Sequence, residues 1–558
     1  MKLNEIKFPV GISDFAKLRD EEYYYIDKTK LISEILSSGI AEVTLITRPR
    51  RFGKTLAMSM LADFFDIRKE SSSHFADLAI AEDAPLCRQW MNKYPVIFIS
   101  LKDIDGISFQ DACAQFSLQF ANLYKEYVYL LDSEAIDSDD ITIFQKIKAG
   151  RAGLADLSRA LSTLMRMLRA YYGKRVILLL DEYDVPIAKA SSHGYYSEML
   201  NIMKPLLSTS LKDNPDLCFA VITGCLRIAK ESIFTGTNNF IADSIMRSNL
   251  KESFGFTQKE VDKLLMEADA ATYADIIRKW YDGYHFDSVD VYCPWDVISY
   301  LYDLQRNPQA KPVSYWRNTS DNSIIRSFID YASGTITEKL EILLGGGYII
   351  QKVDDNLTYD YLHSSEENLW SILYLTGYLT RVRDKESLAA ADEGLALMIP
   401  NAEIKEIFEA TVMQWFDDSA KAYNRQALFA AVWHGDSEAL TQEMTKLLRM
   451  TISYHDYRED FYHAFLAGIF TGAGYVVESN REHGEGRSDV IVKDIRNGRI
   501  AIFEAKYATT LANLPIACSK ALEQTNKRMY AEDFRDDYDE ILCYGIAFFK
   551  KRCLVKSK

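Results

Sequence analysis

The amino-acid sequence predicts an α/β protein built on a buried parallel sheet. Four apolar runs, at 43–47, 95–101, 175–180 and 217–224, lack the polar–apolar alternation of a strand with one solvated face. Long segments with helical spacing separate these runs, and helices that connect parallel strands cover both faces of such a sheet. The first run also leads into a basic, glycine-containing turn and an amphipathic helix, a local architecture that suits anion binding.

Length and composition indicate a globular protein of several domains. At 558 residues the chain exceeds one ordinary core, so we expect two to four domains. Its 48% hydrophobic and 26% charged residues exclude general disorder. No apolar run approaches the roughly 18–20 residues that span a bilayer, and the first residues lack an apolar signal segment. Eight scattered cysteines without metal-ligand spacing favour a reducing compartment, so we expect a cytoplasmic protein without a membrane partner.

The charge distribution bears on nucleic-acid binding. A net charge of −15 is unfavourable for a protein that binds nucleic acid over its whole surface. From Thr451 onward, however, basic and acidic residues are equal in number, so the acidic excess lies in the first 450 residues. A neutral C-terminal module can still bind nucleic acid through a basic rim or a divalent metal.

Residues 44–56, TLITRPRRFGKTL, match the strand, loop and helix of a phosphate-binding loop. In such a loop Lys54 reaches the β- and γ-phosphates, and the Thr55 hydroxyl ligates Mg²⁺. The usual pattern has a glycine where this chain has Arg48, so the loop loses a flexible residue and gains three cations. The alternative is a basic turn before a core helix. The candidate nucleotide ligands in the loop are Arg48, Arg50, Arg51, Phe52, Gly53, Lys54 and Thr55.

Two further strand ends carry polar residues that suit nucleotide hydrolysis. Asp181 and Glu182 follow the third run, where Asp181 can hold the Mg²⁺ water shell and Glu182 can orient or deprotonate the attacking water. Thr223 ends the fourth run and could sense the γ-phosphate, while Arg227 could neutralise its charge. An acidic turn and a helix-starting turn are the alternatives for these two segments. Because the phosphate-loop motif at 44–56 and the acidic strand end at Asp181-Glu182 occur in one chain and in this order, the two motifs together favour nucleotide binding.

Several long motifs carry a family resemblance. They are PVGISDF (9–15), YYYIDKTKLI (23–32), RPRRFGKTL (48–56), LLLDEYD (178–184), TGCLRIAKESIF (223–234), WYDGYHF (280–286) and YWRNTSDN (315–322). Together they resemble the bacterial AAA-ATPase-like proteins, in which the loop usually reads RPRRFGKT, so that Arg48 is that family's own variant. The resemblance implies a P-loop ATPase of the AAA+, additional-strand type, with ATP and Mg²⁺ as cofactors. Related ATPases often form rings, so a homo-oligomer is also expected.

The C-terminal region contains a predicted hairpin with three functional groups. Asn497-Gly498 separates two alternating runs, and a two-residue turn there pairs residue 496 with 499. This register sets Asp489 opposite Lys506, with Glu504 diagonally across on the same face. Two carboxylates beside a lysine suit Mg²⁺ or Mn²⁺, and Lys506 could activate a water or stabilise phosphate charge. A salt-bridge ladder on a solvated face is the alternative.

This region resembles the PD-(D/E)XK nuclease superfamily. The resemblance makes Asp489 the first metal carboxylate and Glu504-Ala505-Lys506 the E-x-K motif. Glu459, with His463 one turn later, matches the acid of the preceding helix, and Glu459, Asp489 and Glu504 are the implied metal ligands. Gln524 and Tyr530 match the last motif. Ser488 replaces the usual proline.

We therefore expect four domains and a combined function. The domains are a P-loop ATPase at 1–250, a helical lid at 251–315, a winged-helix-like connector at 316–400 and an α/β restriction-endonuclease-like domain at 401–558. In the lid, Thr257 caps a helix, and WYDGYHF lines the nucleotide base or packs as an aromatic core. In the connector, a helix ending near Gly377 precedes a hairpin.

The predicted function is ATP-regulated, metal-dependent hydrolysis of nucleic acid, with DNA as the expected partner. One alternative is a nucleotide-switched DNA-binding or signalling protein whose nuclease fold is catalytically silent. The other is an ATPase with a decayed C-terminal domain, and the intact Asp489, Glu504 and Lys506 argue against it.

Overall fold

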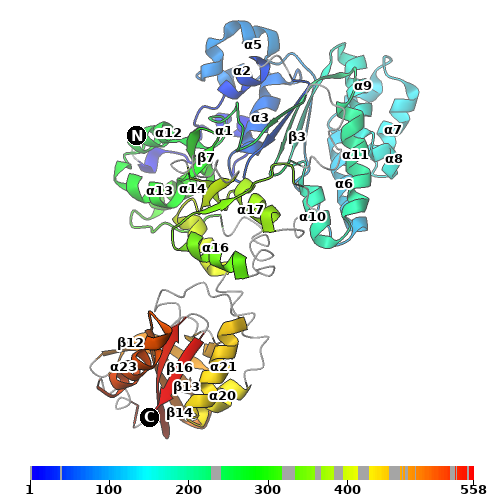
Figure 1. Ribbon diagram of the computed structural model, residues 1–558. Coiled ribbons are helices and arrows are strands. Elements are labelled where there is room, and N and C mark those ends of the chain that lie inside the picture. The colour runs from blue at the N-terminus through cyan, green and yellow to red at the C-terminus, as the bar shows by residue number, and fades with distance from the viewer. Residues whose placement is uncertain are drawn as a thin grey trace. The chain divides into compact units, whose positions relative to one another are not determined.

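The computed structural model describes most of the chain (Figure 1). The described residues are 3–37, 41–227, 240–316, 334–357, 366–382, 394–411, 426–450, 466–467, 469–471, 475–483, 486–527, 534–535, 537–549 and 552–558. They belong to two compact units, Met1–Asp321 with Tyr348–Lys405 and Asn322–Gly347 with Glu406–Lys558. Within the described ranges, no helix combines the length and apolar character needed to cross a membrane.

The first unit is organised around a parallel sheet, as predicted. Its strands are β1 (Val43–Thr47), β2 (Val96–Ser100), β3 (Val176–Asp181), β4 (Leu217–Gly224) and β5 (Phe240–Asp243). Their order is β2-β3-β4-β1-β5, so β4 lies between the strand that leads into the loop and the strand that ends in acid. This inserted strand is the feature that the additional-strand prediction required. Because all pairs are parallel, the ends of β1, β3 and β4 meet at one edge.

Helices cover both faces of this sheet (Figure 1). The helix after the loop, α3 (Lys54–Phe65), packs on one face against β2 and β3. The other face carries α6 (Phe109–Lys125), α9 (Ala160–Tyr172) and α11 (Tyr196–Leu211). The remaining elements before β5 are η1 (Leu3–Glu5), α1 (Phe15–Asp20), α2 (Lys30–Ser37), α4 (Ser72–Phe75), η2 (Ala79–Glu82), α5 (Ala84–Trp90), η3 (Val128–Asp132), α7 (Ser138–Lys148), α8 (Leu154–Leu157) and α10 (Val185–His193).

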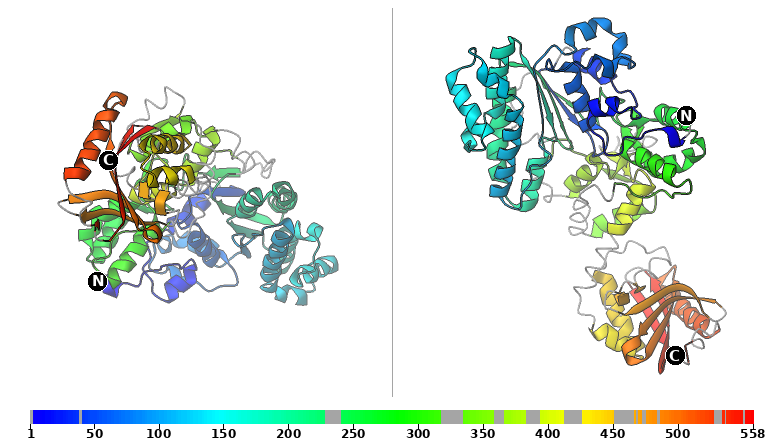
Figure 2. Two further views of the ribbon diagram at one scale, coloured as in Figure 1. Left: turned by 90° about the horizontal axis from the view of Figure 1, so that it is seen from below. Right: turned by 180° about the vertical axis from the view of Figure 1, so that it is seen from behind.

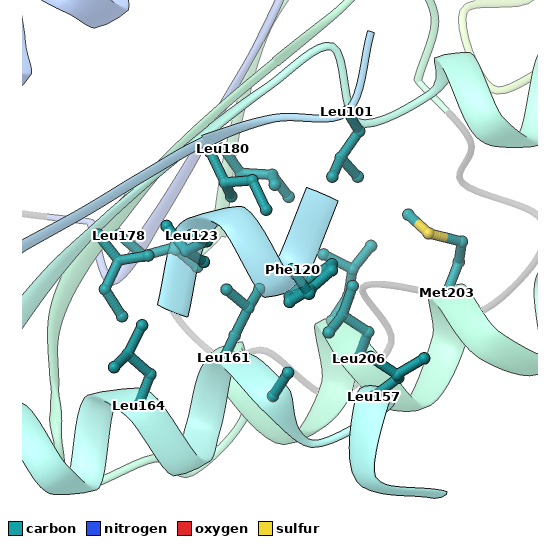
Figure 3. Packing of buried hydrophobic residues seen from close by; sticks show 14 of the residues in the cluster. Leu101, Phe120, Leu123, Leu157, Leu161, Leu164, Leu178, Leu180, Met203 and Leu206 are labelled. Atoms are coloured by element: carbon teal, nitrogen blue, oxygen red, sulfur yellow. The ribbon is translucent and has the colours of Figure 1, made fainter. Parts of the chain in front are cut away.

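Apolar side chains from these helices and strands make the main core. In Figure 3, Leu178 and Leu180 of β3 point toward Phe120 of α6 and Leu161 and Leu164 of α9. All five side chains are fully buried. Burial of each such side chain stabilises the fold by about 1.5–3 kcal/mol, so this layer anchors the strand that carries the acids.

Residues 256–306 form a subdomain that contains helices and a small sheet. Its elements are β6 (Phe256–Thr257), α12 (Gln258–Glu267), η4 (Ala271–Tyr273), α13 (Ala274–Tyr281), β7 (Tyr284–Phe286), β8 (Val289–Tyr292) and α14 (Pro294–Arg306). Thr257 caps α12 with a capping box, as predicted. The strands form an antiparallel sheet in the order β6-β8-β7, so the predicted helical lid also contains strands. Ile6 and Phe8 belong to its core, so the N-terminal segment packs with this subdomain.

The predicted connector contains the expected helix and hairpin. Its elements are β9 (Ile349–Gln351), α17 (Glu366–Leu375), β10 (Thr380–Arg381) and β11 (Leu395–Met398). The helix ends shortly before Gly377, and Thr380 pairs antiparallel with Met398 in a sheet of order β10-β11-β9. The structure groups the chain differently from the four-part division, because α16 (Gly334–Leu344) belongs to the second unit.

The second unit is a mixed sheet with helices on both faces, which agrees with the predicted C-terminal α/β domain (Figure 1, and from two other directions in Figure 2). Strand order is β12-β13-β14-β15-β16, with only β14 and β15 parallel among the described pairs. Helices α20 and α21 lie on one face and α23 on the other. The bounds are α20 (Gln426–Trp433), α21 (Ser437–Met450), β12 (Val476–His483), β13 (Gly486–Asp494), η7 (Ile495–Asn497), β14 (Arg499–Tyr507), η8 (Leu511–Asn513), α23 (Leu514–Lys527), β15 (Glu540–Phe549) and β16 (Arg552–Ser557).

Candidate functional site

The loop after β1 folds around the Lys54 ammonium. Lys54 Nζ donates hydrogen bonds to the carbonyl oxygens of Arg48 and Pro49, each at 3.0 Å, and lies 3.8 Å from Cys225 Sγ. Gly53 begins α3 in the left-handed region, with φ of 86°, where a residue without a Cβ is favoured. The Arg48 amide donates to the Gly224 carbonyl at 3.1 Å, which ties the loop to the end of β4.

Electrostatics keep Lys54 charged although its side chain is buried. Burial alone would lower the pKa of Lys54, but Cys225, Glu182, Asp184 and Asp181 together raise it above its usual value. A charged ammonium in a dry loop is suited to bind an anion.

Asp181 is the point where the loop helix and three strand ends meet. Its Oδ2 accepts hydrogen bonds from Thr55 Oγ1 at 2.9 Å and Ser100 Oγ at 3.3 Å, and its Oδ1 accepts from Thr223 Oγ1 at 2.5 Å. Burial raises the pKa of the Asp181 carboxyl, while the bonds from Thr223 and Thr55 oppose that shift. The structure thus brings three predicted residues, Thr55, Asp181 and Thr223, into contact. Ser100 was not predicted, although its place at the end of β2 was a signal.

The segment after Asp181 is fixed by contacts that sequence reasoning missed. Glu182 has φ of 54°, an uncommon conformation for a residue with a Cβ. Tyr183 donates its hydroxyl to the Leu226 carbonyl at 2.9 Å. Asp184 is buried, and its Oδ2 accepts the amides of Cys225 and Leu226 at 2.9 and 3.0 Å. The second aspartate of the DEYD sequence, Asp184, was the available signal for this tie between the ends of β3 and β4.

The Arg48 side chain is held inside the first unit, and nucleotide binding by this residue stays a prediction. Its side chain is fully buried and forms an ion pair with Asp243 of β5. Its guanidinium also donates to the Thr47 carbonyl at 2.8 Å and to Ser248 Oγ at 2.7 Å. The guanidinium lies 5.2 Å from the Phe254 ring centroid, so both charge and ring contacts hold it inside the protein.

The Phe52 ring is likewise part of the core, and nucleotide binding by this residue stays a prediction. It is buried, with ring centroids of Tyr284 and Phe286 both 5.0 Å away. WYDGYHF therefore packs as an aromatic core, because Tyr281, Tyr284 and Phe286 are all buried. The large apolar area of these rings explains why packing takes precedence over base contact.

The remaining predicted nucleotide ligands of the first unit are arginines. The Arg51 guanidinium lies 4.3 Å from the Trp295 ring centroid, and its backbone has φ of 71°. The Arg227 guanidinium is 5.7 Å from the Phe240 ring centroid. Nucleotide binding by Arg50, Arg51 and Arg227 stays a prediction.

The donor set fits a Mg²⁺–nucleotide complex. Thr55 and Asp181 offer a hydroxyl and a carboxylate oxygen within 2.9 Å of each other, and hard oxygen donors of this kind suit Mg²⁺. The N-terminus of α3 and the Lys54 ammonium supply positive charge beside them.

In the second unit the hairpin register differs from the predicted one. Asp494 pairs with Arg499, and Val490 pairs with Phe503. A longer loop causes the difference, because η7 and Gly498, at φ of 63°, replace the two-residue turn. One residue beyond the pair of Val490 with Phe503, this register sets position 489 opposite Glu504. The predicted pairing of Asp489 with Lys506 is therefore wrong. A shift of two residues leaves each position on its original face.

Glu504 and Lys506 lie together on β14. Glu504 is buried, and its Oε1 lies 3.5 Å from Lys506 Nζ, whose side chain is 31% exposed. Glu504 pairs with Gly545 of β15, where α23 approaches the sheet closely. A Cβ at Gly545 would lie 2.3 Å from the Leu522 amide nitrogen, so only glycine permits this approach. Gln524, one residue of the predicted last motif, belongs to this same helix.

Several predicted nuclease residues lie outside the described part. Glu459, His463 and Tyr530 are not among the described residues. Of Asp489, the structure describes the backbone but not the side chain. Among the residues that the structure describes, no group of three or more His, Cys, Asp or Glu side chains is arranged to hold a metal ion.

Comparisons with known proteins match two parts of the chain. Residues 9–234 match the model described as predicted AAA-ATPase, and residues 457–558 match the PD-(D/E)XK nuclease superfamily. The uncharacterized protein in the vnfD 5′ region of Azotobacter chroococcum mcd 1 is 25% identical, over 97% of this chain and 96% of that protein. The solved structure of the Aeropyrum pernix ORC2 protein, in ADPNP–ADP complexes, is 12% identical with a TM-score of 0.23, covering 71% of this chain and 98% of that chain. This protein therefore carries an AAA-ATPase-like domain and, at its C-terminus, a PD-(D/E)XK nuclease superfamily domain.

Proposed function

We propose that the chain binds and hydrolyses ATP with Mg²⁺, and that its C-terminal domain is a metal-dependent nucleic-acid phosphodiesterase regulated by the ATPase. The contact between Thr55 and Asp181 carries the first part, because it joins the helix after the loop to the acidic strand end. The intact E-x-K residues on β14 support the second part.

In the nucleotide site, Lys54 binds the β- and γ-phosphates, while Thr55 and Asp181 would hold Mg²⁺. When bound, this ion neutralises charge on the phosphates. Glu182 accepts a proton from the water whose oxygen bonds to the γ-phosphorus, and the bond to the β–γ bridging oxygen breaks to leave ADP and phosphate. Thr223 donates to Asp181 and so fixes the orientation of that carboxylate.

In the C-terminal domain, Asp489, Glu504 and Glu459 would hold Mg²⁺ or Mn²⁺, which supplies Lewis-acid chemistry at the phosphodiester. Lys506 positions the attacking water or stabilises charge on the phosphate oxygen. Gln524 and Tyr530 complete the motif, and DNA is the proposed substrate. Arg50 and Arg51 bind nucleotide or a second copy of the chain in a homo-oligomer.

Point variants test the ATPase. Lys54→Ala should abolish Mg·ATP binding in calorimetry, whereas Glu182→Gln should bind ATP and hydrolyse it about 10²–10⁴-fold more slowly. Lys17→Ala, an exposed lysine on α1, is the matched control and should change neither property. Equal ATP affinity of the wild-type protein and the Lys54 variant would refute the assignment.

Digestion of DNA and RNA, with ATP, Mg²⁺ and Mn²⁺ varied independently, tests the nuclease. Glu504→Gln should abolish cleavage, and Glu182→Gln should change its dependence on ATP. If no nucleic acid is cut but ATP alters DNA binding, the chain is a nucleotide-switched binding protein with a silent nuclease fold.

A further inference from the structure

The YYYIDKTKLI motif lies between α1 and α2, and alternate side chains at its start contact the subdomain at 256–306. The Tyr24 hydroxyl donates a hydrogen bond to Glu267 Oε2 of α12 at 2.6 Å. Tyr24 and Ile26 also pack against the apolar core of this subdomain. Both side chains therefore fix the motif to the predicted lid.

The intervening side chains contact the layer that contains the phosphate-loop helix. Tyr25 donates its hydroxyl to Met60 Sδ of α3 at 3.3 Å. Asp27 Oδ2 accepts the Ala79 amide of η2 at 2.7 Å, and Thr29 contacts the same short helix. Such alternation is expected of an extended chain, in which successive side chains point to opposite sides. Residues 23–29 thus form a brace between the sheet layer and the subdomain at 256–306.

Lys28 is the cation of this brace, and it joins the brace to the start of α12. Its Nζ donates to the two carboxylate oxygens of Glu260, at 2.7 and 2.8 Å, and to the Glu252 carbonyl at 2.8 Å. Glu260 Oε2 also accepts the Thr257 amide at 2.7 Å, as part of the capping box. The Lys28 and Glu260 side chains are only 14% and 26% exposed, so solvent screens this charge-assisted contact only in part.

The subdomain at 256–306 in turn packs on the phosphate loop. The Phe52 ring centroid lies 5.0 Å from the ring centroids of two aromatic residues of β7. The Phe52 carbonyl accepts the amide of Gly255, the residue that precedes the subdomain, at 3.4 Å. The Arg51 guanidinium lies 4.3 Å from the Trp295 ring centroid. Because Lys54 follows Phe52 by two residues, the placement of the subdomain affects the part of the loop that is proposed to bind phosphate.

We propose that Lys28 is a positioning residue for nucleotide binding, which acts through Glu260 to hold the subdomain at 256–306 against the phosphate loop. This inference deepens the proposed ATPase function and rests on it. A protein whose binding-competent arrangement is only partly populated binds its ligand more weakly by that fraction, so loosening the subdomain lowers ATP affinity. By linkage, bound Mg·ATP should also slow hydrogen exchange in α12.

Three variants of the lysines in this segment test the role of the charge. Lys28→Met has a side chain of similar length without the ammonium, and it should weaken Mg·ATP binding about tenfold. Lys28→Arg keeps a cation that can bond to both oxygens of Glu260, so its affinity should stay within about threefold of the wild type. Lys30→Met is the matched control, because Lys30 lies two residues further on with a side chain that is 68% exposed, and its affinity should not change.

A fourth variant tests the same contact from the other side. Glu260→Gln removes the charge and keeps an amide oxygen that can accept the Thr257 amide. Because Lys28 acts through Glu260, combining Lys28→Met with Glu260→Gln should weaken ATP binding little more than either change alone. Hydrogen exchange should accelerate in α12 of the Lys28→Met protein and stay unchanged in α9, whereas a general loss of stability would affect both helices.

Calorimetry with Mg·ATP and hydrogen exchange of the full chain, on variants shown by circular dichroism to be folded, distinguish the outcomes. Wild-type ATP affinity in Lys28→Met, or equal weakening in Lys28→Arg, overturns the inference. Additive effects of Lys28→Met and Glu260→Gln, or equally accelerated exchange in α9 and α12, overturn it as well. If Lys28→Met does not fold, Glu260→Gln takes its place in the comparison, and wild-type ATP affinity in that variant overturns the inference.

The wild-type protein separates this inference from the proposed function. If it does not bind Mg·ATP, the proposed ATPase function fails, and this result is known before any variant is compared. If it binds Mg·ATP and the Lys28 variants bind equally well, only the positioning role of Lys28 fails.

Discussion

Replacing Asp243 by alanine should destabilise the first unit, because it leaves the Arg48 cation buried without its counter-charge. Arg48 is 0% and Asp243 2% exposed, and removing one partner of such a pair costs about 3–5 kcal/mol. Asp243 also accepts Ser248 Oγ at 2.8 Å and the Asn249 amide at 2.7 Å, which lose their acceptor. A loss of about 4 kcal/mol in a unit of several hundred residues lowers its melting temperature by roughly 5 °C.

Calorimetric melting of the full chain measures this effect, and hydrogen exchange of peptides from β1 and β5 assigns it to the first unit. Lys17→Ala is the control, because its ion pair with Glu21 spans 4.0 Å between side chains that are 55% and 44% exposed. Loss of that pair should cost less than about 1 kcal/mol. The double variant Arg48→Met with Asp243→Leu removes both charges and should recover most of the stability. An Asp243→Ala protein with the same melting temperature as the wild-type protein would refute the structural role given to Arg48.

Three further outcomes follow from the two candidate sites. Thr223→Val removes the 2.5 Å bond to Asp181 and should cost about 1–3 kcal/mol and slow ATP turnover, measured by urea unfolding and phosphate release. Gly545→Ala places a Cβ 2.3 Å from the Leu522 amide nitrogen and should destabilise the second unit by about 1–3 kcal/mol, with faster hydrogen exchange in α23 as the check. Lys506→Ala should reduce DNA cleavage about 10²–10⁴-fold while metal-induced thermal stabilisation persists, since Lys506 is a cation and not a metal ligand.

The parallel sheet was predictable because its determinants are local. Runs such as Val176–Leu180 are apolar at every position, and each ends in polar residues. The parallel arrangement brings those ends to one edge, so the contact of Thr55 with Asp181 followed from sequence order and fold class. In the same way, the sequence of α12 contains its own start signal at Thr257.

Sequence reasoning was limited where tertiary contacts decide the surroundings of a residue. A sequence pattern predicts that Arg48 and Phe52 lie in a phosphate loop, but not that Asp243 and the aromatic rings of β7 lie beside them. The hairpin register failed for a local reason. Asp494 accepts hydrogen bonds from Asn497 Nδ2 and Arg499 Nη2, both at 2.7 Å, and these bonds stabilise a longer loop than Asn-Gly alone indicates.

The contacts of Arg48 show how the predicted phosphate loop is held in place without its first glycine. A glycine at that position lets the main chain approach the phosphates closely. Here the Arg48 side chain is buried at the ends of β1 and β5, where it forms an ion pair with Asp243. The Arg48 main chain still bonds to Gly224 and to Lys54, so the loop keeps its shape around the ammonium. The ion pair with Asp243 thus anchors the loop at Arg48, so we expect the shape of the loop to depend on a residue almost 200 positions away.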